Sequence, residues 1–552
     1  MSGHRQSLVR QTKRRRFLAN RAAKLARERR KRKHAVHNVW RHLTRDQQEV
    51  AKRLTKGQIS LVTISGWGFL ASFLAFLDEL EFYALLGIEG TGFKRVMIPI
   101  ARLIITYQLK ILLGIPSINL VPTKLFREVA LLKLIGYTTT QMQVGFYERG
   151  NLAAGPMHKN TLADAVERLS AEELERLLNE TAKRLAERGF FKESKGHFAL
   201  DATDLETTPK CVGAGLKKYT EWKVNKDKKA VEVERYAYGF KVLIVYEVHL
   251  RLVVAAKVVP IQKHESQFTL PLVRQAVKNV GRGVLRVLLI DRGFLDGQDL
   301  WVLKRGMGID FVVPAKENMR VTADAQGLCR EEVDGAHIIK QEHVGKQRVV
   351  KKGKKEEVRW EGQVSVVGVA ELRSYDQYGD EEHIKHANSK GFKGNALNAV
   401  VVTKWQGEEY EAGKEKVFLT SLPITKPLEV LDLYDLRSLI ENTAFRELKQ
   451  GWCLKKYPKK TEKAIQGHVF LTLVTFTLAN AFRTALGQEL AGRGVRRQRA
   501  EEESGKVIVF AGEHYAIFDI EEVFILLGVV PQQCLRVNPA KVRRRYGLPS
   551  AA

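Results

Sequence analysis

Three acidic side chains in this sequence have the residue types and contexts needed for metal-dependent phosphate chemistry. Asp201 closes the apolar run at residues 198–200, and Asp291 closes the apolar run at residues 287–290. Short apolar runs of this kind predict buried strands, and strands that end in an acid deliver it to a crevice at the edge of a sheet. Together with Glu441, in a segment of helical spacing, they form a candidate metal site.

The segment around Glu441 adds a phenol and a guanidinium to this set. Tyr434, Arg437 and Glu441 follow the i, i+3, i+7 spacing, which places them on one stripe of a helix. Arginine suits bidentate phosphate contact, and a tyrosine hydroxyl can also hydrogen-bond a phosphate. Two alternatives stay open: Arg437 could form an ion pair with Asp432 or Asp435, and Tyr434 could pack in the core.

This segment resembles the signature of the DDE transposases of bacterial insertion sequences, and within them of the insertion sequence 4 family. That signature is Tyr, two residues, Arg, three residues, Glu, six residues, Lys. Its first three members match Tyr434, Arg437 and Glu441, whereas the fourth position is Leu448 and the nearest lysine, Lys449, comes one residue later. Residues 200–203 and 289–294 are similar to the two aspartate blocks of the family, and the resemblance covers about residues 196–490.

The resemblance implies a fold and a function. It implies an α/β fold with a ribonuclease-H-like catalytic core that is interrupted by a β-rich insertion, and 149 residues separate Asp291 from Glu441 here. It also implies a transposase that binds the terminal inverted repeats of a mobile element, cleaves DNA and joins the ends to target DNA, as a homodimer on DNA. Two rivals are a transposase-derived DNA-binding protein without cleavage and a structure-specific nuclease of the same fold.

Phosphoryl transfer of this kind uses two Mg²⁺ (or Mn²⁺) ions about 4 Å apart. Mg²⁺ takes oxygen ligands and keeps several waters, so three carboxylates and the substrate phosphate are sufficient. We expect Asp291 to hold one ion and Glu441 the other. The role of Asp201 as the bridge between the two ions is implied by the resemblance.

The late lysine poses a geometric question. On a regular helix Leu448 lies on the stripe of Glu441, and Lys449 is turned about 100° away from it. A one-residue π-bulge between Glu441 and Lys449 would absorb the extra residue and restore the register. The alternative is that the long stem of Lys449 reaches around the helix.

The charge of the chain predicts a polyanionic partner. The formal net charge is +30, and residues 1–57 contribute +16 of it, with nineteen Lys or Arg against three acids. We expect this basic arm to contact the DNA backbone, with a solvating tail or a membrane-surface helix as alternatives. A lysine cluster around Pro458 is either a phosphate track or a solvated face. The candidate DNA contacts in these two segments are Arg14, Arg15, Arg16, Arg30, Arg32, Lys455 and Lys456.

Other function classes find little support in the sequence. Four dispersed cysteines form no C-x-x-C pair, which favours a reducing cytoplasm. The resemblance implies a bacterial protein associated with the nucleoid. Residues 57–77 are uncharged and long enough to cross a bilayer, but their polar and small residues favour a buried helix and no membrane contact. A Gly-rich phosphate loop is absent, so nucleotide hydrolysis is not indicated.

Composition and periodicity divide the chain into six parts. Residues 1–57 form the basic arm, and residues 58–195 form an all-α N-terminal DNA-binding region, whose role at the DNA ends is implied by the resemblance. Residues 196–317 and 419–490 form the two parts of the ribonuclease-H-like core, on either side of the β-rich insertion at 318–418. Residues 491–552 form a linker and a small C-terminal unit.

Overall fold

The computed structural model describes most of the chain beyond the basic arm. The predicted DNA contacts Arg14, Arg15, Arg16, Arg30 and Arg32 lie outside the described residues. The described segments are residues 42–64, 68–88, 98–146, 155–224, 230–330, 338–352, 355–387, 389, 392–406, 409–410, 415–485, 506–529 and 537–549.

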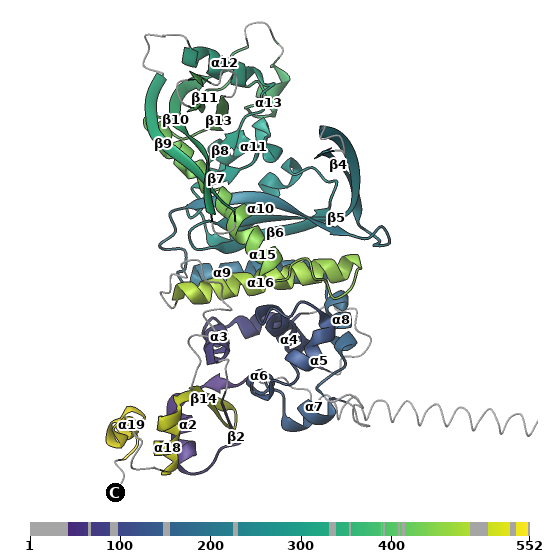
Figure 1. Ribbon diagram of the computed structural model, residues 1–552, viewed down its shortest axis with the longest axis vertical. Helices are drawn as coiled ribbons and strands as arrows, with labels where there is room; N and C mark the ends of the chain where they lie inside the picture. The colour runs from purple at the N-terminus through teal and green to yellow at the C-terminus, as the bar shows by residue number, and fades with distance from the viewer. Residues whose placement is uncertain are drawn as a thin grey trace, which may run out of the picture.

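One large sheet forms the centre of the molecule (Figure 1). The core strands have the order β6-β5-β3-β7-β8. Neighbours among β6, β5 and β3 are antiparallel, and β7 and β8 run parallel to β3. This is the topology of a ribonuclease-H-like core, as predicted. The core strands are β3 (His197–Thr207), β5 (Ala230–Glu247), β6 (Leu252–Pro260), β7 (Val287–Ile290) and β8 (Asp310–Pro314), and β4 (Gly215–Val224) extends β5 as a hairpin.

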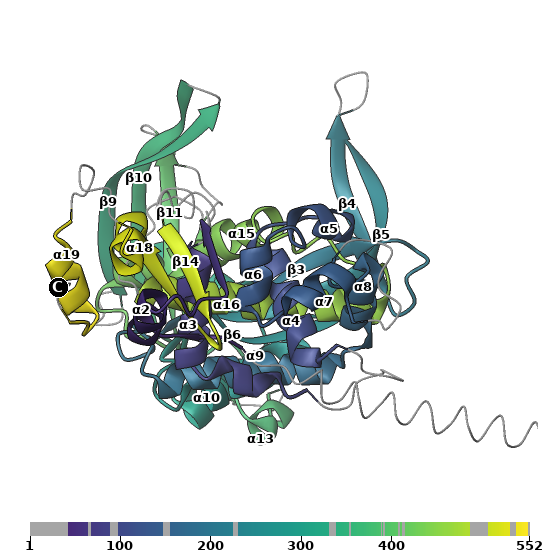
Figure 2. The same ribbon diagram turned by 90° about the horizontal axis from the view of Figure 1, so that it is seen from below.

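The insertion continues the core sheet. Strand β13 pairs antiparallel with β8, and β11, β10 and β9 follow in order, so that eleven strands form one sheet. The prediction of a β-rich insertion is confirmed. Its elements are α12 (Arg320–Arg330), β9 (Ile338–Lys352), β10 (Lys355–Leu372), α13 (Glu381–Lys385), β11 (Leu397–Gln406), β12 (Glu409–Tyr410) and β13 (Lys416–Thr420). Figure 2 shows the β4–β5 and β9–β10 hairpins rising on the same side, at opposite ends of the sheet order.

Helices cover the core sheet and connect it to the N-terminal region. Helices α9 (Ala171–Glu187), α10 (Thr269–Val280) and α16 (Glu462–Ala485) pack on β6. Among the described residues, α16 alone is long and apolar enough to cross a membrane by length and composition, and 94% of its most apolar window is buried inside the protein. It lies between the sheet and the N-terminal helices as the central helix of the core (Figure 1).

The N-terminal region is mostly helical, but the prediction that it is all-α is wrong. Residues 57–77, predicted as one buried helix, contain strand β2 (Leu61–Ile64) before α3 (Gly68–Glu79). Strand β2 pairs with a strand more than 440 residues later, so local periodicity could not identify it. The helices of this region are α3, η1 (Phe82–Leu86), α4 (Ile100–Leu112), η2 (Ile118–Leu120), α5 (Val121–Lys124), α6 (Val129–Leu134), α7 (Thr139–Val144) and α8 (Lys159–Arg168).

Residues 44–64 form a second, small unit with described residues from 506 to 545, at the opposite end of the molecule from the insertion (Figure 1). Its four-stranded sheet has the order β1-β15-β14-β2, so N-terminal strands flank a C-terminal hairpin. The sequence predicted a small C-terminal unit within residues 491–552, but its sheet also contains strands from residues 44–64. Its elements are β1 (Thr44–Arg45), α2 (Gln47–Thr55), β2, β14 (Lys506–Ala511), β15 (His514–Asp519), α18 (Ile520–Leu527) and α19 (Pro539–Arg545).

The interleaved sheet generates a stability prediction. Phe510 is fully buried on β14 and pairs with Leu61 of β2. We expect Phe510→Ala to destabilise this unit by about 3–5 kcal/mol, because it removes a buried aromatic ring and leaves a cavity. Hydrogen exchange should show faster exchange of the β2 amides.

The matched control is Phe524→Ala on α18. The Phe524 side chain is 38% exposed, so its truncation should leave the exchange of β2 close to that of the wild type. Equal effects of the two variants would show that the β14–β2 pairing does not hold the N-terminal strand in place.

Candidate active site

The three acids predicted from the sequence line a single cavity of about 470 Å³. Asp201 comes from β3, Asp291 follows β7 directly, and Glu441 comes from the π-helical turn η6 (Ile440–Phe445). The structure therefore brings together side chains that lie up to 240 residues apart. The other lining residues are Ala202, Thr203, Arg437, Asn442, Phe445, Arg446, Lys449 and Gln450.

The register of the parallel strands explains why the two aspartates meet. Leu200 of β3 is the partner of Ile290 of β7, so the residue that follows each of them is an aspartate. Asp201 was expected to end its strand, but β3 continues to Thr207 along β5. It is instead the point where β3 separates from β7, and this separation opens the space into which both carboxylates extend.

The segment that carries Glu441 is not one regular helix. Helix α14 (Pro427–Asp435) is followed by a turn, by the π-helical η6, and by α15 (Arg446–Gln450), which Gly451 caps. Of the two alternatives for the late lysine, the structure contains the π-helical turn. A π-turn holds one more residue per turn than an α-helix. As a result, Leu448 is fully buried and Lys449 lines the cavity.

Arg437 forms its ion pairs with the acids of the cavity. Its Nη1 lies 3.0 Å from Asp201 Oδ2, and its Nη2 lies 4.0 Å from Glu441 Oε2. The guanidinium also lies 5.7 Å from the ring centroid of Tyr434, which packs against Phe418 with ring centroids 4.7 Å apart. Burial raises the Tyr434 pKa to about 12. Tyr434 therefore packs beneath Arg437, and its phosphate contact stays a prediction.

Of the two acids that pair with Arg437, Asp201 is the more buried, and its environment disfavours the ionised carboxylate. Its side chain is 14% exposed, against 69% for Glu441. Burial, together with the nearby carboxylates of Asp291 and Glu441, raises the Asp201 pKa to about 6. The Ala202 N–H, which donates to Oδ1 at 2.7 Å, and the Arg437 guanidinium act in the opposite direction. The fold therefore favours the protonated form of Asp201, although Arg437 lies beside it.

The donor set fits hard divalent cations. Carboxylate oxygens are the ligands that Mg²⁺ and Mn²⁺ take in proteins, and the mutual repulsion of the three acids favours a bound cation. Within the described part of the chain, however, no three acidic, histidine or cysteine side chains form a ready-made metal cluster. The Arg437 guanidinium pairs with both Asp201 and Glu441 and so provides neutralising charge between these two acids.

The predicted lysine contacts have different surroundings. Lys449 is partly buried, and burial together with Lys455 lowers its pKa. Lys455 and Lys456 are exposed beyond α15. Lys459, a neighbour in the same cluster, forms ion pairs with Asp164 at 2.5 Å and Glu167 at 2.6 Å, so it fastens this loop to α8. A phosphate track in this lysine cluster would therefore not include Lys459.

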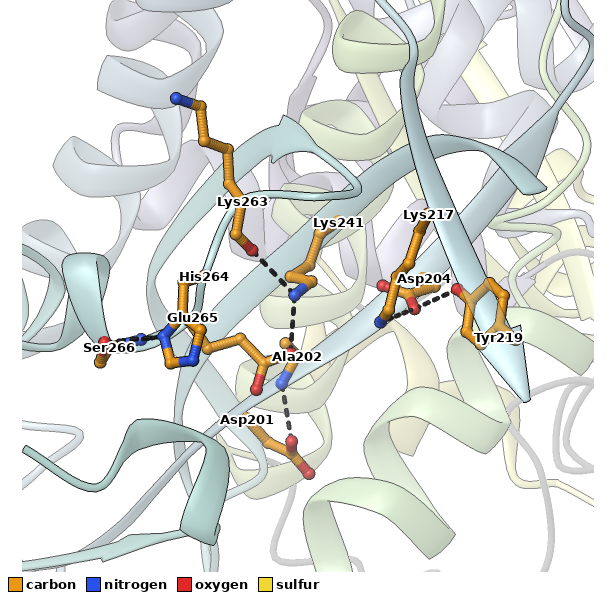
Figure 3. Close-up of polar contacts among 10 residues, drawn as sticks. All are labelled: Asp201, Ala202, Asp204, Lys217, Tyr219, Lys241, Lys263, His264, Glu265 and Ser266. Carbon is orange, nitrogen blue, oxygen red and sulfur yellow. Dashed lines mark hydrogen bonds and ion pairs between the residues drawn. The ribbon is translucent and has the colours of Figure 1, made fainter. Parts of the chain in front are cut away.

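Two acids that follow the site aspartates in the sequence have structural partners. Asp204 accepts hydrogen bonds from Lys217 Nζ at 2.8 Å and from the Tyr219 hydroxyl at 2.6 Å (Figure 3). Asp296 caps α11 (Gly297–Trp301) by accepting a hydrogen bond from the Asp299 N–H.

Sequence reasoning missed four polar lining residues. Thr203 lies two residues after Asp201, on the same face of β3, and could have been found from the strand period. Asn442, Arg446 and Gln450 lie on the segment that carries Glu441, where the π-turn changes which residues share a face. Regular helical spacing could not have selected them.

The core topology and the clustered acids define a ribonuclease-H-like protein with a candidate phosphoryl-transfer site. A model of the family described as "Transposase DDE domain" matches residues 192–478, which is more than half of the chain. The chain belongs to this family and is a DDE transposase, a DNA-binding enzyme of metal-dependent DNA cleavage and transfer. The matched range contains Asp201, Asp291 and Glu441.

Two further comparisons complete this finding. A solved structure that the chain is similar to is a piggyBac transposase synaptic complex with hairpin DNA, at 11% identity and a TM-score of 0.34. The match covers 91% of this chain and 86% of that chain. No curated protein matches the sequence.

The π-turn generates a prediction about the signature lysine. Exchanging the two residues, as Leu448→Lys with Lys449→Leu, would restore the family signature in the sequence. We expect this variant to lose several kcal/mol of stability, because the new lysine enters a fully buried position without an acidic partner. Urea denaturation measures the loss.

Lys449→Leu alone is the control, and it should change stability by about 1 kcal/mol or less. If the exchanged variant is as stable as the control and still binds DNA, position 448 faces the cavity, and the π-turn does not set the register.

The pKa of Asp201 generates a second prediction. Its folded-state value of about 6 lies above the ordinary value of 3.8, so the fold favours the protonated acid. This contribution to stability is fully present below about pH 4 and is lost as the pH rises through 6. Asp201→Asn, which cannot ionise, should therefore raise the free energy of unfolding by about 1–3 kcal/mol at pH 8 and by little at pH 4. Urea denaturation at both pH values measures this difference. An equal change in the free energy of unfolding at pH 4 and at pH 8 would show that Asp201 ionises with its ordinary pKa.

Proposed function

We propose that this transposase cleaves DNA at the ends of a mobile element and joins the ends to target DNA, with two Mg²⁺ or Mn²⁺ ions held by Asp201, Asp291 and Glu441. One observation carries the proposal: these three acids and the cations Arg437, Arg446 and Lys449 line a single cavity. Acids that can hold metal thus lie beside cations that can hold phosphate. The sequence resemblance to the insertion sequence 4 family supports the same reaction and a bacterial origin.

The acids have different tasks in this proposal. Bound divalent ions supply an activated oxygen nucleophile and offset charge on the leaving oxygen. Asp201, the buried member, faces both other acids and would hold the shared position, with Asp291 and Glu441 holding one ion each. Arg437 neutralises Asp201 in the free protein. Once metal provides that neutralisation, its guanidinium can turn to a DNA phosphate.

The basic side chains around the cavity would hold the DNA strand. Lys449 and the exposed Arg446 line the cavity directly, and Lys455 and Lys456 follow on the exposed surface beyond α15. Contacts of this kind neutralise phosphates and position the strand without reading its sequence. The strands that carry the aspartates lie between the two edge hairpins in the sheet order, so the DNA would lie between the hairpins (Figure 2).

The remaining parts of the chain would bring the DNA ends to this cavity. We propose that the basic arm contacts the phosphate backbone, because it carries more than half of the net charge. The helical N-terminal region would bind the terminal inverted repeats, and two copies of the chain would pair the two ends. These assignments, and the bacterial cytoplasm as the site of action, rest on the family resemblance.

The test compares two groups of variants on duplex DNA that carries the inverted repeats flanking the gene. Replacing Asp201, Asp291 or Glu441 by Ala should lower Mg²⁺-dependent cleavage by at least about 100-fold, since metal ligands are lost. DNA affinity without metal should stay within about twofold. Lys449→Ala should lower that affinity by about tenfold, the effect of one charge-assisted phosphate contact.

Lys278→Ala on α10, an exposed lysine away from the cavity, is the control and should change neither property. Undiminished cleavage by the acid variants would refute the proposed site. Cleavage of branched junctions without preference for the repeats would identify a structure-specific nuclease. Binding without any cleavage by the wild type, in Mg²⁺ and in Mn²⁺, would identify a DNA-binding derivative.

A further inference from the structure

A buried lysine lies outside the cavity and takes no part in the mechanism above. Lys241 belongs to β5, and its side chain is 5% exposed. Its ammonium lies 2.8 Å from Glu265 Oε1 and donates to the carbonyl oxygen of Lys263 at 3.0 Å (Figure 3). Glu265 and Lys263 belong to the connection between β6 and α10. One charged group therefore fastens this connection to the core sheet.

Burying such a pair is not an efficient way to stabilise a fold. The loss of hydration of two charges often exceeds their attraction, and apolar residues of similar size are frequently as stable. A buried pair can still fix the relative position of the elements that it joins. The question is which element depends on the position of Glu265.

The turn after Asp291 is the element that depends on the position of Glu265. The 3₁₀ turn η4 (Arg292–Phe294) begins directly after this acid and contains Gly293. A Cβ atom at Gly293 would lie only 2.4 Å from Glu265 Oε2. The second carboxylate oxygen of Glu265 thus rests against the backbone that carries Asp291, at a distance that only glycine permits.

The other end of the pair belongs to the sheet that carries Asp201. Lys241 is the register partner of Asp204 on β3, three residues beyond Asp201. In Figure 3 the Glu265 side chain extends from its connection toward the Asp201 segment of β3. Neither Lys241 nor Glu265 lines the cavity.

We propose that Lys241 and Glu265 are positioning residues that set the separation of the Asp201 and Asp291 carboxylates, and through it the affinity for the metal ions. This inference rests on the proposed function, because it assigns these aspartates to a metal site. Lys241 holds Glu265 from the sheet, and Glu265 holds the Asp291 turn. Mg²⁺ demands near-ideal ligand geometry, and groups that orient metal ligands typically change metal affinity by 10- to 100-fold when they are lost.

The test measures Mn²⁺ binding to the full-length protein by electron paramagnetic resonance, without DNA, so that cleavage is not the readout. The principal variant combines Lys241→Met with Glu265→Gln. It removes both charges together, so no unpaired charge stays buried and the fold should survive. We expect Mn²⁺ affinity to fall by about tenfold or more, with an unchanged midpoint of thermal unfolding.

Two further variants separate positioning from a general effect. Gly293→Ala introduces the close contact with Glu265 and should also weaken Mn²⁺ binding by about tenfold. Lys257→Met with Glu175→Gln is the matched control, since this pair has the same 2.8 Å distance but joins β6 to α9. The control pair should leave Mn²⁺ affinity within about twofold.

Asp201→Asn distinguishes failure of the inference from failure of the proposed function. If it abolishes Mn²⁺ binding while the Lys241 and Glu265 double variant binds as the wild type does, the positioning role is wrong and the metal site stands. If Asp201→Asn binds Mn²⁺ as the wild type does, the metal site itself is wrong, and the inference falls with it.

Discussion

Repulsion among three carboxylates is the constraint on which the rest of this structure depends. Asp201, Asp291 and Glu441 share one cavity, and burial first, then the charges of the other two acids, raises the pKa of Asp201. In the free protein the Arg437 guanidinium moderates this repulsion. The strands and the π-helical turn place the acids around one cavity. The repulsion that Arg437 does not offset favours the binding of a further cation.

The elements around the cavity each solve part of this positioning problem. Parallel pairing of β3 with β7 brings the two aspartates side by side, and the departure of β3 from β7 opens the space between them. One more residue lies between Glu441 and Lys449 than in the family signature. The π-turn absorbs this residue and brings both side chains to the same cavity. π-turns cost hydrogen-bond quality and are found most often at functional sites, in agreement with this position.

The sequence predicts those features that depend on local pattern. Apolar runs before Asp201 and Asp291, helical spacing around Glu441 and β-rich composition in the insertion identified the core and its acids. Features that depend on distant partners escaped it. Strand β2 was read as part of a helix because its partner β14 lies at the other end of the chain. Arg446 and Gln450 were missed because the π-turn rotates them toward the cavity.

The small unit built from both ends of the chain has a consequence for synthesis. Strand β2 ends at Ile64, and its partner β14 begins at Lys506, so 442 residues must be made before the two can pair. At about 5–20 residues per second, translation needs about 20–90 s for this interval. During that time β2 lacks its pairing with β14, although Asp201 and Asp291 have already been synthesised. This unit therefore forms only after β14 has been made, and a chain terminated before Lys506 would lack it.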